Sequence, residues 1–277
     1  MPLVIQTNQA SLQAQNNLSK TQNALSVSFN RLSSGYRINS AADDSAGLAI
    51  SENMKLQIRS YTVAERNAND GISMTQTAEG SLGQLTDLLG RMRELAMEAA
   101  NGSMSSADRD YLSTEFTQLQ AEIGRIQDSS SYDGTYLIGT ATQQVDFQVG
   151  ITNQTTDRIA VTFGGLDIGS LRGTGTSVAG TDGTNAQSAL DTIDTALKTI
   201  STTRASFGAA MNRFDSAISN IQSVRTNLSA ANSRIRDVDI AEESSIMAKN
   251  QVLAQAGASV LAQANQTPQL ALSLLKG

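Results

Sequence analysis

An apolar residue returns alternately every three and four positions through the last third of the chain, and this repeat constrains the fold more than any other feature. The series begins at Leu190 and ends at Ile235, and eleven of its fourteen positions are apolar. A repeat averaging 3.5 residues over more than six heptads is typical of a coiled-coil helix. At about 1.5 Å per residue this helix would be roughly 70 Å long, so we expect an elongated, mainly α molecule.

Two upstream segments carry apolar stripes that could pack against this helix. Their members are Leu82, Leu85, Leu89, Met92 and Ala96 in the first, and Leu112, Phe116, Leu119, Ile123 and Ile126 in the second. Asn101-Gly102 lies between the two segments and favours a turn between antiparallel helices. The sequence therefore predicts an antiparallel bundle of three helices that bury their stripes against one another.

The middle of the chain has a different character. Residues 145–163 alternate apolar and polar side chains around a polar connection, which predicts a small β-hairpin. Residues 164–185 contain seven glycines and are expected to form a short, Gly-rich exposed loop. No glycine there precedes Lys-Ser or Lys-Thr, so the phosphate-binding loop of nucleotide-binding proteins is not indicated.

Both ends of the chain have helical apolar spacing and almost no charge. The candidate assembly residues are Leu18, Leu25, Phe29 and Leu32 near one end, and Ile246, Leu253, Val260, Leu270 and Leu274 near the other. Lys20 is the only charge between residues 1 and 30, and Lys276 the only one between 250 and 277. Helix faces built from Gln, Asn, Ser and Ala can be buried without desolvating a charge. We expect the termini to pair as a helical coiled coil and to pack against other copies, folding as they assemble; the alternative is that they pair only with each other.

Composition excludes most catalytic chemistry. The chain has no Cys and no His, which removes thiol nucleophiles, Ser-His-Asp triads and Cys or His metal sites, so we expect no enzyme activity and no cofactor. The net charge of −6 without a Lys/Arg-rich run argues against nucleic-acid binding. Polar residues interrupt the uncharged ends, which argues against a signal peptide and a membrane span. Asp43-Asp44 could be an acid/base pair, but capping of a helix that starts there is the favoured interpretation.

Several long motifs resemble those of bacterial flagellins. Residues 32–51, Leu-Ser-Ser-Gly-Tyr-Arg-Ile-Asn-Ser-Ala-Ala-Asp-Asp-Ser-Ala-Gly-Leu-Ala-Ile-Ser, are similar to the N-terminal signature of that family. Asn-Ala-Asn-Asp-Gly-Ile-Ser at 67–73 is another match, and the stretch from Gln255 to Gln266 resembles the other end of the family. The resemblance covers roughly 1–165 and 186–277, nearly the whole chain.

The resemblance implies a domain layout. It assigns 1–43 plus 236–277 to a terminal coiled-coil assembly domain, 44–163 plus 186–235 to a helical rod domain with a β-hairpin at about 145–163, and 164–185 to a loop that replaces the family's outer domains. It also implies a structural subunit that is exported unfolded, assembles through its terminal helices into the extracellular flagellar filament, and supports swimming motility. A hook–filament junction protein with the same helical ends is the alternative.

The resemblance also implies partners. Besides other copies of the chain, these are an export chaperone at the C-terminal helix and the filament cap and hook-junction proteins. A segment around Arg91 matches the part of the family recognised by an animal Toll-like receptor, so Arg91, Leu95 and Glu115 become candidate receptor contacts. Separately, Arg204, Arg225 and Asn232 interrupt the long apolar series. They are candidates for setting the packing state of the subunit, as polar residues set register in coiled coils, or they face solvent.

Overall fold

The chain divides into two compact units. In the computed structural model, which describes residues 7–172 and 175–276 and the side chains only as far as residue 266, unit 1 comprises residues 1–58 and 226–277, and unit 2 comprises residues 59–225. Both boundaries fall inside long helices, α2 (Ser45–Ala99) and α5 (Thr184–Arg236).

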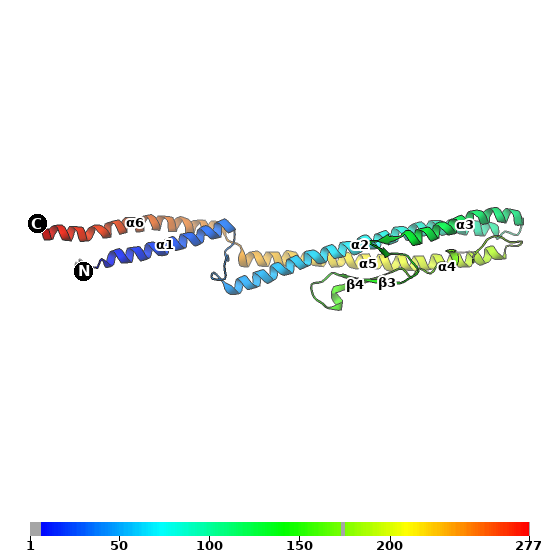
Figure 1. Ribbon diagram of the computed structural model, residues 1–277, viewed down its shortest axis with the longest axis horizontal. Helices are drawn as coiled ribbons and strands as arrows, with labels where there is room; N and C mark the ends of the chain where they lie inside the picture. The colour runs from blue at the N-terminus through cyan, green and yellow to red at the C-terminus, as the bar shows by residue number, and fades with distance from the viewer. Residues whose placement is uncertain (1–6, 173–174, 277) are drawn as a thin grey trace. The chain divides into compact units, whose positions relative to one another are not determined.

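Unit 2 is built on three helices, α2, α3 (Ser106–Ser129) and α5 (Figure 1). Ion pairs join Glu79 to Arg204 and Arg93 to Asp194, so positions rise along α2 as they fall along α5, and the two helices are antiparallel. The turn predicted at Asn101-Gly102 separates α2 from α3. Ser105 starts α3 with a capping box, because its side chain accepts from the Asp108 N–H while the Asp108 carboxylate accepts from the Ser105 N–H.

The predicted apolar stripes form the core of unit 2. The α2 stripe is fully buried, with Leu82, Leu85, Leu89, Met92 and Ala96 all 0% exposed. Phe116 and Ile123 of α3 and Phe207 and Phe214 of α5 are also fully buried. Gly71 allows α2 to approach α5, since a Cβ at this position would lie 2.5 Å from the Phe214 ring. The three-helix prediction is thus confirmed for unit 2.

The hairpin consists of β3 (Gln143–Gln148) and β4 (Arg158–Phe163), antiparallel with Val145 opposite Val161, and a 3-10 turn, η1 (Thr155–Asp157), precedes β4. Its aromatic residues pack on α5: the Phe147 ring meets Phe214 edge-on at 5.3 Å, and Phe163 lies 5.4 Å from Phe207. A second pair that the sequence did not indicate, β1 (Ser131–Tyr132) with β2 (Thr135–Tyr136), closes around Asp133-Gly134, both with positive φ.

The segment 164–185 is not the exposed loop that its glycine content suggested. It buries Leu166, Ile168, Leu171 and Val178, each 0 or 1% exposed, and contains a short helix, α4 (Gly169–Arg172). The Gln127 side-chain amide of α3 donates to the Leu166 carbonyl at 2.9 Å. The expectation was wrong because apolar residues spaced among the glycines were sufficient to anchor the segment on the core.

Unit 1 contains the pair α1 (Gln9–Ser34) and α6 (Ile240–Lys276), which lie side by side and antiparallel (Figure 1). Most of the buried residues in the seam are small: they are Ser11, Ala14 and Ser28 on α1 and Ala264 on α6. Glu243 of α6 is also buried, and it pairs with Arg31 of α1. Gly35 ends α1 with φ of 75°, the left-handed cap expected of a glycine there. A mainly α fold with a small hairpin region and paired helical ends is therefore confirmed.

Candidate assembly surfaces

The apolar stripe of α6 that the sequence singled out faces away from α1. Ile246, Leu253 and Val260 are 39%, 46% and 58% exposed. The α6 residues that are half-buried or buried instead follow another stripe, which begins at Glu243 and Ser244 and continues through Met247, Asn250, Ala254, Gly257, Leu261 and Ala264. Helix α6 thus packs on α1 through one stripe and leaves a second, apolar stripe uncovered.

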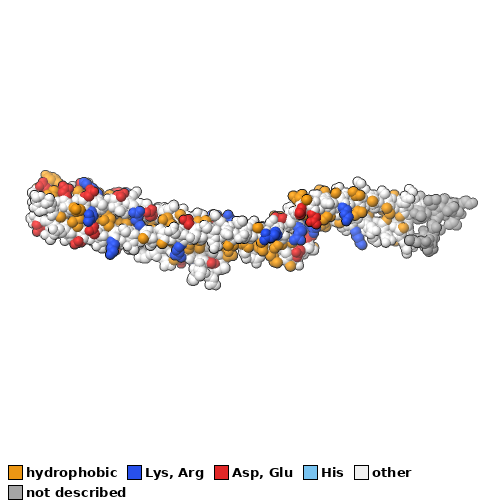
Figure 2. Space-filling view, turned by 180° about the vertical axis from the view of Figure 1, so that it is seen from behind, with side chains coloured by type: hydrophobic (Ala, Val, Ile, Leu, Met, Phe, Trp, Pro, Cys, Tyr) orange, Lys and Arg blue, Asp and Glu red, His pale blue; other side chains and the backbone are white. Residues whose placement is uncertain are grey.

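On α1 the predicted residues divide between the seam and the surface. Leu18, Leu25 and Leu32 are half-buried, and a Cβ at Gly257 would lie 3.4 Å from the Leu18 side chain. Phe29 is 65% exposed. Hydrophobic side chains show on the surface of unit 1 in Figure 2. The side chains of Leu270 and Leu274 lie outside the described part of the chain.

The α1–α6 pair has further exposed apolar residues that lie outside the seven-residue spacing of the predicted stripes, and the sequence pattern did not indicate them. They are Leu12, Val27, Ile240 and Val252, with exposures between 41% and 66%. Single apolar residues on a surface are ordinary, but a group of them on one helix pair is the pattern of an interaction surface. The missing charges in the sequence were the signal that could have pointed to them.

The far end of the α1–α6 pair is joined by polar contacts. Pro268 has no N–H, so the Ala264 carbonyl lacks the hydrogen bond that an interior helical residue would receive. The Asn8 side-chain amide donates to that carbonyl at 2.7 Å, while its oxygen accepts from the Ser11 N–H and caps α1. Ser11 also donates through its hydroxyl to Asn265 at 2.7 Å. One side chain therefore caps α1 and fixes its register on α6.

Two short segments connect α1 to α2 and α5 to α6, and they pair with each other at the other end of the α1–α6 pair. Tyr36 and Asp237 form an antiparallel bridge, and the Val238 N–H donates to the Gly35 carbonyl at 3.1 Å. The Arg236 guanidinium stacks over the Tyr36 ring at 4.5 Å and pairs with Glu52. These contacts hold the segments that connect the terminal pair to the long helices.

Asp43 and Asp44 are structural. The N–H and hydroxyl of Ser40 donate to the Asp43 carboxylate and hold its pKa below the ordinary value. Asp44 accepts from the Gly47 N–H at 2.8 Å at the start of α2. The capping interpretation is confirmed.

The residues that interrupt the long apolar series of α5 find different partners. Arg204 and Arg225 face α2 and form salt bridges with Glu79 and Glu65. The side-chain oxygen of Asn232 is buried without a hydrogen-bond partner among the described residues. Neither arginine simply faces solvent, because each pairs with a carboxylate on the neighbouring helix.

Arg91 and Glu115 lie together on the surface of unit 2. Arg91 Nε donates to Glu115 Oε1 at 2.8 Å, and a second nitrogen donates to Glu94 at 2.9 Å. Hydrogen bonds to Glu115 and then Glu94 raise the pKa of the Arg91 guanidinium. Leu95, by contrast, is 1% exposed and belongs to the core. A protein that docks here can reach the ion pair but not the Leu95 side chain as it lies in this structure.

Among the described residues, no group of three or more acidic side chains is placed to hold a metal ion. No described helix is sufficiently long and apolar to cross a membrane.

Comparison with known proteins identifies the family. The family model for the bacterial flagellin N-terminal helical region matches residues 5–142, and that for the C-terminal helical region matches 190–275. The chain is a member of the bacterial flagellin family. A flagellin of Halalkalibacterium halodurans is 41% identical over 99% of this chain and 100% of its own length. A flagellar filament 33 kDa core protein of Treponema phagedenis is 38% identical over 99% of this chain and all of its own length.

A solved structure shares the fold at low identity. The structure of a putative flagellar hook-associated protein from Vibrio parahaemolyticus superposes with a TM-score of 0.60 over 70% of this chain and 100% of that one, at 13% identity. This likeness concerns the fold alone. The helical framework of this flagellin-family chain is therefore also found in that structure.

Proposed function

We propose that the chain is the structural subunit of a bacterial flagellar filament, exported unfolded and assembled outside the cell through its terminal helices. The observation that carries the proposal is the outward apolar stripe of α6, with Leu253 and Val260 about half exposed. Burial of apolar surface drives association, and an uncharged face can be buried without the cost of desolvating a charge. The full-length relatives named as flagellin and filament core protein support the same function.

Polymerisation of the purified chain tests this proposal. Concentrated protein should form long filaments visible by electron microscopy, and expression in a flagellin-deleted swimming bacterium should restore motility. A chain that stays monomeric at high concentration and does not restore a filament in such a strain would contradict it. We expect no enzyme activity, since the arrangement described is one of packing surfaces.

A hook–filament junction protein that shares the same helical ends is the alternative. Such a protein would occupy a junction in a few copies. It should not form long filaments alone, and it should fail to replace flagellin in the deletion strain. The identity of 41% to a flagellin over nearly the whole chain favours the filament subunit.

We further propose partners at three places. The C-terminal part of α6 would bind an export chaperone before assembly, and filament cap and hook-junction proteins would contact the polymer ends. The exposed Arg91–Glu115 pair would contribute to recognition by a host Toll-like receptor, with Leu95 supporting the surface from below. An Arg91→Asp monomer that signals as strongly as the native monomer would rule out the receptor contact.

Arg204, Arg225 and Asn232 are proposed to influence the packing state of the subunit. The salt bridges of the two arginines fix α5 against α2, and a partly buried pair cannot be broken without leaving a charge unpaired. Changing Arg225 to Leu should alter the waveform of the filament under dark-field microscopy. A filament of unchanged waveform would reject this role for Arg225.

A further inference from the structure

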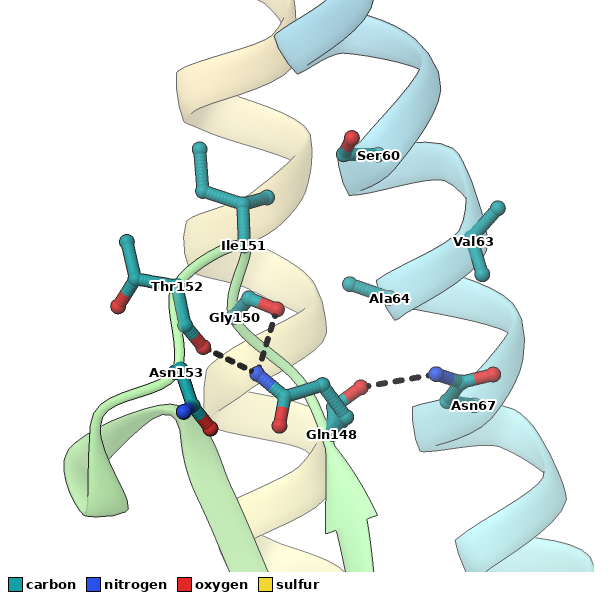
Figure 3. Close-up of a pocket in the computed structure, with 9 residues that line it drawn as sticks. All are labelled: Ser60, Val63, Ala64, Asn67, Gln148, Gly150, Ile151, Thr152 and Asn153. Carbon is teal, nitrogen blue, oxygen red and sulfur yellow. Dashed lines mark hydrogen bonds between the residues drawn. The ribbon is translucent and has the colours of Figure 1, made fainter.

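Unit 2 has a hollow between the hairpin and α2 that the assembly surfaces above do not include. It has a volume of about 490 Å³ and opens widely to solvent. It is lined by uncharged residues only, namely Ser60, Val63, Ala64, Asn67, Gln148, Gly150, Ile151, Thr152 and Asn153. Figure 3 shows Ser60 and Ala64 of α2 on one side and residues 150–152 of the hairpin loop on the other.

Hydrogen bonds within the hairpin loop fix the side of the hollow that the hairpin forms, without any bound partner. The Val149 and Gly150 N–H groups donate to the Asp157 carbonyl, and Thr152 donates through its N–H and hydroxyl to the Asp157 carboxylate. The Asn67 side chain ties the wall to α2 by donating to the Gln148 carbonyl at 3.0 Å (Figure 3). A preformed site binds with little ordering cost.

The complementary feature is Tyr111 near the start of α3. At 77% exposed, it is the most exposed large hydrophobic side chain among those described. The buried guanidinium of Arg109 holds this end of α3 by donating to the carbonyls of Ala99, Asn101 and Thr181 at 2.8, 3.0 and 3.2 Å. Tyr111 is thus an exposed aromatic side chain on a helix end that Arg109 holds in place.

The tyrosine and the hollow of one chain cannot meet. Ala64 lines the hollow, Ala99 lies beside the start of α3, and the helix between them is about 50 Å long at 1.5 Å per residue. Two different surfaces displaced along one unit are what a head-to-tail contact between identical subunits requires, and such a contact repeats without closing.

The charges around the two features are complementary. Arg59 and Arg66, exposed on α2 beside the hollow, form no salt bridge with any described residue. Asp108 and Asp110, exposed on either side of Arg109, lie within one turn of Tyr111. Opposite charges around a contact favour one orientation and disfavour like-charged alternatives.

We propose that Tyr111 of one copy docks into the hairpin hollow of the next copy in the polymer. The ring would pack on Ala64 and Ile151, and the hydroxyl would reach the side-chain amides of Asn67 or Asn153, which suits an amphipathic aromatic residue. This inference rests on the proposed function and adds to it a specific contact outside the terminal helices.

The absence of Cys from the chain allows a direct test. A Tyr111→Cys, Ile151→Cys double variant is polymerised and treated with a short bismaleimide, which joins two thiols that lie close together. A ladder of covalent dimers, trimers and longer oligomers on a denaturing gel is expected. Each single variant alone should give no ladder. A Thr117→Cys, Ile151→Cys variant is the matched control, because Thr117 is exposed on α3 but roughly 120° around the helix from Tyr111.

The outcomes separate the two proposals. Filaments of the Tyr111→Cys, Ile151→Cys variant that give no ladder, or an equal ladder from the control, would overturn the contact and leave the filament function intact. Failure of the native chain to form filaments would overturn the function and with it the contact. If the double variant does not polymerise, a charge-reversal experiment provides the test. Arg66→Glu should raise the critical concentration for assembly about tenfold. Adding Asp110→Lys to that variant should restore the native critical concentration. No change in either variant would contradict the contact.

Discussion

The two units bury their apolar residues in opposite ways. In unit 2 most large apolar side chains face inward, and Phe207, Phe214, Leu85 and Leu89 are fully buried, whereas Tyr111 is an exception. In unit 1 the seam is made mostly of small residues, while Phe29 and Val260 are more than half exposed. A unit that buries most of its large apolar residues has a stable core of its own in the monomer. A unit that displays them reaches its lowest free energy only when another molecule covers them.

The strongest test of this difference between the units is a charge placed on the outward stripe of α6. Val260→Asp should abolish polymerisation, because an unpaired carboxylate would be buried between copies, yet the monomer should keep its helix content. Sedimentation measures the polymer and circular dichroism the monomer. Val260→Thr, which is similar in shape and uncharged, is the control and should weaken assembly only partly. Normal filaments from Val260→Asp would show that this stripe stays exposed in the polymer.

The same substitution in both units tests the contrast next. Phe214→Ala should lower the free energy of unfolding of the monomer by about 3–5 kcal/mol, since a fully buried ring leaves a cavity. Phe29→Ala should change it by less than about 0.5 kcal/mol, as a surface residue would, while raising the critical concentration for assembly. Urea unfolding of both monomers is the measurement. Equal losses of stability would refute the division of roles.

Two glycines of α2 probe how tightly unit 2 is packed. Gly71→Ala should destabilise the monomer by about 1–3 kcal/mol, because the new Cβ would overlap the Phe214 ring. Gly83→Ala is the matched control: nothing lies within 4 Å of its Cβ position, and alanine favours the helix by up to about 1 kcal/mol. The midpoint temperature of thermal unfolding should therefore fall for Gly71→Ala and rise for Gly83→Ala. A neutral Gly71→Ala would mean that α2 and α5 can separate freely at this point.

Within unit 1, the polar end of the seam should contribute less. Asn8→Ala should cost about 1 kcal/mol by removing a helix cap and the donor to the Ala264 carbonyl. The loss should be smaller in a Pro268→Ala background, because an alanine N–H then supplies that carbonyl within α6. Thermal melting is measured by circular dichroism for the native chain, the two single variants and the double variant, and the difference gives the coupling free energy between Asn8 and Pro268. Asn16→Ala serves as an exposed control. Additive effects would contradict the link between Asn8 and Pro268.

The smallest effect concerns an exposed, polar element of unit 2, the hairpin loop. Donors from Thr152 lower the pKa of Asp157, so its folded-state pKa lies below the unfolded one. Its stabilising contribution is present above the ordinary pKa of 3.8 and is lost as pH falls through the folded value. Exchange of the Thr152 amide hydrogen should therefore accelerate in strong acid, where Asp157 becomes protonated. Thr152→Val removes the hydroxyl donor, so the pKa of Asp157 should be lowered less and the loop should loosen at a higher pH than in the native chain. Unchanged exchange on acidification would show that the carboxylate does not hold the loop.

Periodicity predicted unit 2 well and unit 1 incompletely. Buried stripes such as Leu82 to Ala96 follow directly from spacing, because a large apolar core admits few other arrangements. Spacing could not tell which of two stripes on α6 faces α1. Ile246, Leu253 and Val260 have the stronger apolar pattern, but Ala254, Gly257 and Ala264 allow closer approach of the backbones. The hollow and Tyr111 escaped prediction because they depend on how distant segments meet and carry no local motif.

The hydrogen bond from Asn8 to the Ala264 carbonyl joins residues 256 positions apart. Closing a loop of that length has the greatest entropic cost of any polar contact described for the chain, and it can form only when both ends are present together. A chain released gradually from one end would complete its other contacts first. The bond between Asn8 and α6 would then mark the completion of folding, so that the terminal pair becomes correctly registered only in a chain that has emerged whole.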